Sequence, residues 1–149
     1  MGYMRHHAIV VTSSAPELLK AAHVKAVELG MSVTGITAEV TNGYSSFLVA
    51  PDGSKEGWAE SDAGDVRRDR FTAWLDEQRY DDDSTSLGWV EVQFADDEHE
   101  TAIMRDSDEH SRRRYGEPKY NIGGRNRPVD LILATARVEH ELAYYGGAQ

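Results

Sequence analysis

The chain contains no cysteine. This absence excludes a disulfide framework, a thiol nucleophile and any metal centre with thiolate ligands. The chain also lacks an apolar run of about 20 residues, the length that crosses a bilayer, and its first residues carry no cleavage signal of a secretory leader. With 149 residues, 40% apolar and 28% charged, we expect a soluble cytoplasmic protein with one hydrophobic core.

Positive charge is scarce in most of the chain. Residues 1–110 hold 9 Lys and Arg against 22 Asp and Glu, a net charge of −13, whereas residues 111–149 hold 7 against 4, a net charge of +3. An acidic body disfavours direct binding to nucleic acid, because that binding depends on cationic side chains that release counterions. A protein that mimics the charge of DNA remains an alternative.

Turn-forming residues are concentrated between positions 42 and 58. Asn42-Gly43 is typical of a tight hairpin turn, since both central positions of a type I′ turn need positive φ. Pro51-Asp52-Gly53 predicts a second turn, in which Pro presets φ and Gly supplies the left-handed step. So many constraints on the backbone indicate either a structural hinge or the floor of a binding site.

The hydrophobic pattern predicts an alternation of strands and helices. We expect strands over 7–13, 33–41, 44–50, 90–94 and 101–105, and helices over 15–29 and from about 61 to 78. Val66, Phe71, Trp74 and Leu75 are expected to form the apolar side of the second helix. The order β-α-β-β-α-β-β predicts an α+β two-layer sandwich, ferredoxin-like or related, over residues 1–106.

The last third of the chain differs in composition. We expect an irregular basic linker over 107–127 and a C-terminal helix over 128–149. A lone helix with apolar residues on both faces needs a partner surface, so it predicts an oligomerisation arm and a homo-oligomer.

The motifs of common enzymes are absent. There is no phosphate-binding glycine loop and no Gly-x-Ser-x-Gly nucleophile elbow, and the carboxylates lie mostly at expected caps and loop tips. A small phosphodiesterase or nuclease, metal-assisted or not, is the enzymatic alternative. It would use His99 and Thr101 with His6 or His7. We assign no catalytic residue, metal or cofactor.

The turn-rich segment offers a different kind of chemistry. Aromatic, hydroxyl and cationic side chains there would suit an anionic aromatic ligand such as a nucleotide, with the arginine run of the basic linker as a second cationic source. The predicted ligand-binding residues are Tyr44, Ser45, Ser46, Lys55, Trp58, Arg112, Arg113 and Arg114.

Two runs carry a resemblance to a known group of proteins. The segments 6–13 (HHAIVVTS) and 42–58 (NGYSSFLVAPDGSKEGW), extended by 60–62 and 89–94, are similar to a family of small uncharacterised phage and prophage proteins, over about residues 6–100. The resemblance implies a gene product at work in the cytoplasm of an infected bacterium. It implies no activity and no catalytic residues.

These observations together predict a non-enzymatic accessory protein that binds and blocks a host component. The component is either a nucleotide-type defence signal, which the protein would sequester, or the surface of a host protein. No membrane partner is expected.

Overall fold

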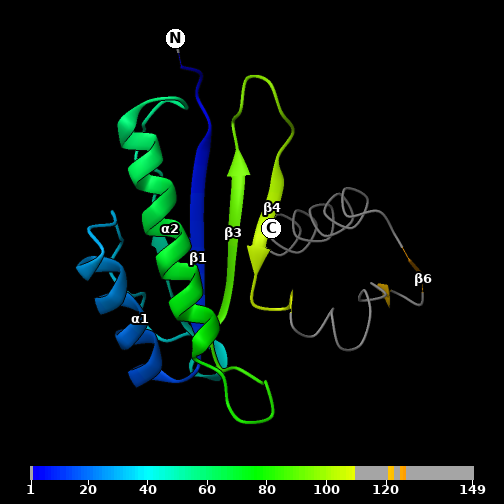
Figure 1. Ribbon diagram of the computed structural model, residues 1–149. Coiled ribbons are helices and arrows are strands. Elements are labelled where there is room, and N and C mark those ends of the chain that lie inside the picture. The colour runs from blue at the N-terminus through cyan, green and yellow to red at the C-terminus, as the bar shows by residue number, and fades with distance from the viewer. Residues whose placement is uncertain (1, 110–120, 123–124, 127–149) are drawn as a thin grey trace, which may run out of the picture. The chain divides into compact units, whose positions relative to one another are not determined.

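The computed structural model describes residues 2–109, 121–122 and 125–126, and the chain divides into two units, residues 1–110 and 111–149. The described residues of the first unit include four strands and two α-helices (Figure 1). In chain order they are β1 (His6–Ser13), α1 (Pro16–Glu28), β2 (Ser45–Val49), α2 (Ala59–Glu77), β3 (Gly88–Phe94) and β4 (Ala102–Asp106). The predicted α+β class is confirmed, and the closer comparison with a ferredoxin-like sandwich remains a prediction.

The four strands form one antiparallel sheet in the order β2-β1-β3-β4. β1 is central, with Ile9 opposite Val49 of β2 on one side and Glu91 of β3 on the other. This register sets which side chains share a face, because alternate residues of a strand point to opposite sides.

The predicted strand over 33–41 is not a regular strand. The segment nevertheless follows the free edge of β2, where the backbone N–H groups of Thr34 and Thr37 donate to the carbonyl oxygens of Leu48 and Ser46, at 2.9 Å each. The Asn-Gly turn lies in a short 3-10 helix, η1 (Thr41–Gly43), with φ of 60° at Asn42 and 73° at Gly43. Positive φ at both positions is the conformation that the dipeptide favours.

The helices begin and end for local reasons. Pro16 occupies the start of α1, where its missing N–H costs nothing, and Gly30 follows the helix with a left-handed φ of 76°. α2 begins at Ala59, two residues before the expected cap, and carries Glu60 and Asp62 in its first turn. Negative charge there complements the helix dipole.

The hydrophobic core lies between the helices and one face of the sheet. Its largest fully buried side chains are Phe71, Ile9, Leu19, Leu75 and Leu87. The expected role of Val66 in the apolar side of α2 is wrong, because its side chain is 47% exposed. The prediction is confirmed for Phe71 and Leu75, which are buried together with Arg68 and Thr72, and Trp74 is partly buried against the core.

The second unit contributes one described element pair, β5 (Asn121–Ile122) and β6 (Arg125–Asn126), which are antiparallel to each other. The rest of the predicted basic linker, including Arg112, Arg113 and Arg114, lies outside the described residues, and so does the predicted helix over 128–149. Among the described residues, no helix has the length and apolar character required to cross a membrane.

Candidate functional site

Polar and charged side chains replace the apolar core at the end of the sheet where β1 begins. Glu91 and Gln93 of β3 are 2% and 7% exposed and lie on the face that the helices cover. Arg68 of α2 is also buried. The alternation of β3 was visible in the sequence, but its polar residues are the ones that the helices cover. Charged groups in such a place need partners.

The partners of Glu91 come from two elements. Its carboxylate accepts hydrogen bonds from Nε and Nη2 of Arg105 on β4, and it lies 3.5 Å from Nε of Arg68 on α2. Arg105 also pairs with Asp69 at 2.8 Å, and Arg68 pairs with Asp65. Although burial acts in the opposite direction, these bonds to Glu91 and Asp69 raise the pKa of Arg105. The buried carboxylate is thus fully committed to two arginines.

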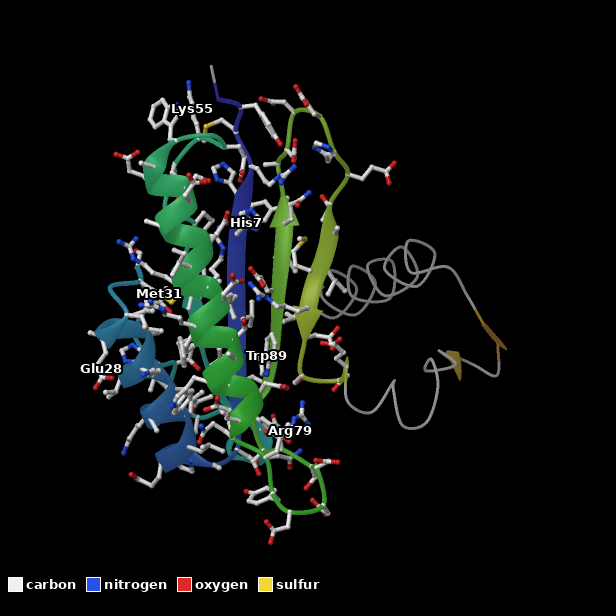
Figure 2. The ribbon with its side chains drawn as sticks, viewed as in Figure 1. His7, Glu28, Met31, Lys55, Arg79 and Trp89 are labelled. Carbon is white, nitrogen blue, oxygen red and sulfur yellow. The ribbon has the colours of Figure 1, made fainter. Side chains whose placement is uncertain are left out.

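His7 lies near this network, since the charges of Arg68 and Glu91 both act on it. Figure 2 shows His7 toward the N-terminal end of β1. Its side chain is 10% exposed, its Nε2 lies 3.5 Å from Oε1 of Glu56, and its Nδ1 is buried without a partner among the described residues. Burial lowers the pKa of His7, the positive charge of Arg68 lowers it further, and the charges of Glu91 and Glu56 only partly oppose this. His7 is therefore neutral at physiological pH.

Next to His7, a cavity of about 220 Å³ opens between α2 and the loop that follows α1. We call it the interhelix pocket. It lies above β1 and is bordered by the loop after α1, the chain after β2 and the middle of α2. Apolar lining comes from Ile9, Met31, Val49, Ala50 and Pro51; polar lining comes from His7, Ser32, Asp52, Arg67 and Arg68.

Asp52 forms the wall of the pocket that faces α2. Its Oδ1 accepts hydrogen bonds from the backbone N–H of Ser54, at 2.8 Å, and from the Ser54 hydroxyl, at 2.6 Å. Burial raises its pKa, but the bonds from Ser54 and the charges of Arg68 and Arg67 outweigh that effect and lower the pKa below its ordinary value. Asp52 is therefore ionised at neutral pH.

Gly64 allows the carboxylate of Asp52 to lie against α2. A Cβ atom at position 64 would lie 2.6 Å from Oδ2 of Asp52 and 3.2 Å from Nη1 of Arg68. The first distance is shorter than any normal contact, so the carboxylate lies against the helix only because the residue there is glycine.

Arg67 is the available cation of the pocket. It is exposed, and no hydrogen bond or ion pair joins it to another of the described side chains. Arg68, by contrast, is held by Asp65 and Glu91. The pocket therefore presents one guanidinium with free donors beside one ionised carboxylate, above an apolar floor.

A second polar cluster fixes the tip between β3 and β4. Nε of Arg5 donates to Oδ2 of Asp96 at 2.6 Å, and the backbone N–H groups of Glu98 and His99 donate to its Oδ1. Although desolvation raises the pKa of Asp96, these hydrogen bonds and the charge of Arg5 lower it to about 2. Nδ1 of His99 lies 3.1 Å from Asp96 Oδ2 and 3.1 Å from Arg5 Nη2.

The ligand-binding residues predicted from the sequence lie in two places. Ser45 and Ser46 are opposite Ser13 and Thr12 of β1, at its C-terminal end, with Tyr44 directly before them. Lys55 forms an isolated bridge with Met4, before the N-terminal end of β1, and its Nζ lies 5.6 Å from the ring centre of Trp58. Figure 2 shows Lys55 at that end of the sheet. The two groups lie at opposite ends of the sheet, so a ligand would contact one or the other.

The histidines of the enzymatic alternative are also held separately. His99 belongs to the cluster with Arg5 and Asp96, His7 pairs with Glu56, and the ring of His6 packs 5.6 Å from that of Phe94. In the described part of the chain, no group of three His, Asp or Glu side chains is placed to hold a metal ion.

The sequence did not predict that four residues of the pocket lie together: His7, Asp52, Arg67 and Arg68. Arg68 could have been found, because positions 68, 71, 72 and 75 share one face of a helix. Asp52 was visible only as a turn residue. Their meeting depends on the pairing of β2 with β1, which places the turn beside α2.

Comparison of the chain with protein-family models, with curated proteins and with solved structures gave no match. The pocket and its chemistry therefore carry the functional argument alone.

Proposed function

We propose that the protein is a non-enzymatic binding protein that captures a small molecule with an anionic group in the interhelix pocket. The observation that carries the proposal is Arg67, an exposed guanidinium with unused donors at the rim of a cavity of about 220 Å³. A guanidinium binds carboxylate and phosphate groups through two parallel hydrogen bonds.

The surrounding groups favour binding over catalysis. Glu91 is bound to two arginines, Asp52 accepts two hydrogen bonds from Ser54, and His7 lies between Glu56 and Arg68. General base catalysis needs a group with a proton affinity near the working pH that reaches the substrate. Asp52 is a weak base because its pKa is lowered, and the lowered pKa of His7 likewise makes its imidazole a weaker base than an ordinary histidine.

The resemblance found in the sequence suggests a biological role for ligand binding. Following the resemblance to phage and prophage proteins, we propose that capture of the ligand in the bacterial cytoplasm withholds it from a host component. A nucleotide-type defence signal is one such ligand, and an abundant host metabolite is another. The protein would then act by stoichiometric sequestration, so its copy number would have to match the amount of ligand.

Isothermal titration with inorganic phosphate, AMP, isovalerate and L-leucine tests the proposal. We expect at least one of these probes to bind wild-type protein, and Arg67→Gln to weaken that binding about tenfold, the effect of losing a charged hydrogen-bond pair. Arg70→Gln is the matched control, because Arg70 is exposed on α2 but does not line the pocket. Equal binding by wild type and Arg67→Gln, or no binding by any probe at 10 mM (about −2.7 kcal/mol), would overturn it.

A further inference from the structure

We infer that the ligand is a small zwitterion with an apolar side chain, of the type of a free apolar α-amino acid. The inference rests on the proposed function, since it accepts the interhelix pocket as the site. It adds the class of molecule, which follows from the pairing of charges inside the pocket and from its size.

The pocket holds two opposite charges that are not joined. Arg67 and Asp52 both line it, and no direct ion pair connects these two described residues. Oδ2 of Asp52 receives no hydrogen bond from the described residues, since both of its Ser54 donors bind Oδ1. A ligand that brings a carboxylate to Arg67 and an ammonium group to Asp52 satisfies both groups.

The apolar floor specifies the rest of the ligand. Met31, Ala50 and Pro51 are partly exposed and give the pocket a small apolar surface, over the buried side chains of Ile9 and Val49. Burial of an aliphatic side chain there is favourable by roughly 25 cal/mol per Å² of apolar surface. Met31 adds adaptability, because an unbranched thioether accommodates side chains of different shape.

The size of the cavity separates this class from a nucleotide. Pockets for drug-sized ligands span about 300–1,000 Å³, whereas this one has about 220 Å³. The surroundings also oppose several phosphate charges, because residues 1–110 carry 22 acidic against 9 basic side chains. A net-neutral zwitterion avoids that repulsion.

The experiment compares L-leucine with two analogues that each lack one charge. Isovalerate keeps the carboxylate and isoamylamine keeps the ammonium group on nearly the same carbon skeleton. For wild-type protein in isothermal titration, we expect leucine to bind about tenfold more tightly than either analogue, the effect of one charged hydrogen-bond pair.

Two variants test which charged residue of the pocket binds which charged group of the ligand. Asp52→Asn should weaken leucine about tenfold and leave isovalerate unchanged, and Arg67→Gln should weaken both leucine and isovalerate. Circular dichroism checks that each variant is folded, and Arg70→Gln again serves as the control.

The outcomes separate this inference from the proposed function. If isovalerate binds as tightly as leucine and Asp52→Asn has no effect, the zwitterion is wrong while the anion pocket stands. If AMP or phosphate binds more tightly than leucine in an Arg67-dependent manner, the ligand class is again wrong. If no probe binds, both proposals fail.

Discussion

The interface between α2 and the sheet has two halves of opposite character. Near the C-terminal end of β1, the buried apolar side chains of Phe71, Leu75, Val11 and Trp89 belong to one hydrophobic cluster. Near the N-terminal end, the same helix and strands bring together Arg68, Glu91 and Gln93, which are just as buried. We call the two halves the apolar half and the ionic half.

This difference indicates which half stabilises the fold and which half fixes the geometry of the pocket. Apolar packing stabilises in proportion to the area removed from water and tolerates small shifts. A buried ion pair gives back in Coulomb energy roughly what desolvation costs, but only in one geometry. We therefore expect the apolar half to hold the domain together and the ionic half to fix the position of the interhelix pocket, whose wall includes Arg68.

Removal of the central carboxylate should have the largest effect. Glu91→Ala leaves two arginines near Glu91 without their shared partner, and Arg68 is buried, so we expect a loss of about 3–5 kcal/mol in urea denaturation. The double variant Arg68→Met/Glu91→Leu removes both buried charges and should be more stable than Glu91→Ala. A double variant less stable than the single one would contradict this expectation, because it would mean that Arg68 stabilises the fold without its partner.

The apolar half can be predicted from the sequence and the ionic half cannot, because different interactions bury their side chains. The apolar half was predictable, since periodic positions such as Phe71 and Leu75 identify a buried helix face without knowledge of the partner strand. The ionic half was not, because Glu91 and Gln93 look like the solvent side of an alternating strand. Only the tertiary pairing of Glu91 with Arg68 and Arg105 makes their burial favourable. The pocket depends on another tertiary pairing, that of β2 with β1, which brings Asp52 beside α2, so its residues were missed together.

Filling the space at Gly64 should have the next largest effect. Glycine to alanine in the interior of a helix normally stabilises by roughly 0.5–1 kcal/mol. Here the added Cβ would meet Oδ2 of Asp52 at 2.6 Å, and the carboxylate could move aside only by giving up its hydrogen bonds from Ser54, so Gly64→Ala should instead destabilise by about 1 kcal/mol. The double variant Gly64→Ala/Asp52→Ala removes the obstructing carboxylate and should recover most of the loss in thermal denaturation. No recovery would show that the clash lies elsewhere, at Arg68.

Acidification should weaken the ionic half before the apolar half. The pKa of His7 in the folded protein lies below its ordinary value of 6.5, so the unfolded chain binds the proton more readily. The contribution of His7 is therefore fully present above about pH 6.5 and is lost as the pH falls from 6.5 through the folded-state pKa. In urea titrations, the free energy of unfolding of wild type should fall between pH 8 and 5, and that of His7→Gln should fall less.

A second loss of stability should follow at lower pH. Asp96 and Asp52 have pKa values below the ordinary 3.8, and that of Asp96 is about 2. Their contributions are present above about pH 4 and are lost as the pH falls through the folded-state pKa of each group, which for Asp96 is about 2. For the first loss, His7→Gln is the test. If its free energy of unfolding falls between pH 6.5 and 5 as steeply as that of wild type, another group causes the loss and the role of His7 is contradicted.

The smallest effect is expected at Val66, which the helical pattern places among the core positions of α2 and the structure leaves 47% exposed. Val66→Lys should change the free energy of unfolding by less than about 0.5 kcal/mol, as substitutions at exposed sites do. Phe71→Ala on the same helix is the matched comparison, with an expected loss of about 3–5 kcal/mol because Phe71 is fully buried. A loss above about 2 kcal/mol for Val66→Lys would mean that this side of α2 is covered in solution, and the boundary of the apolar half would then include it.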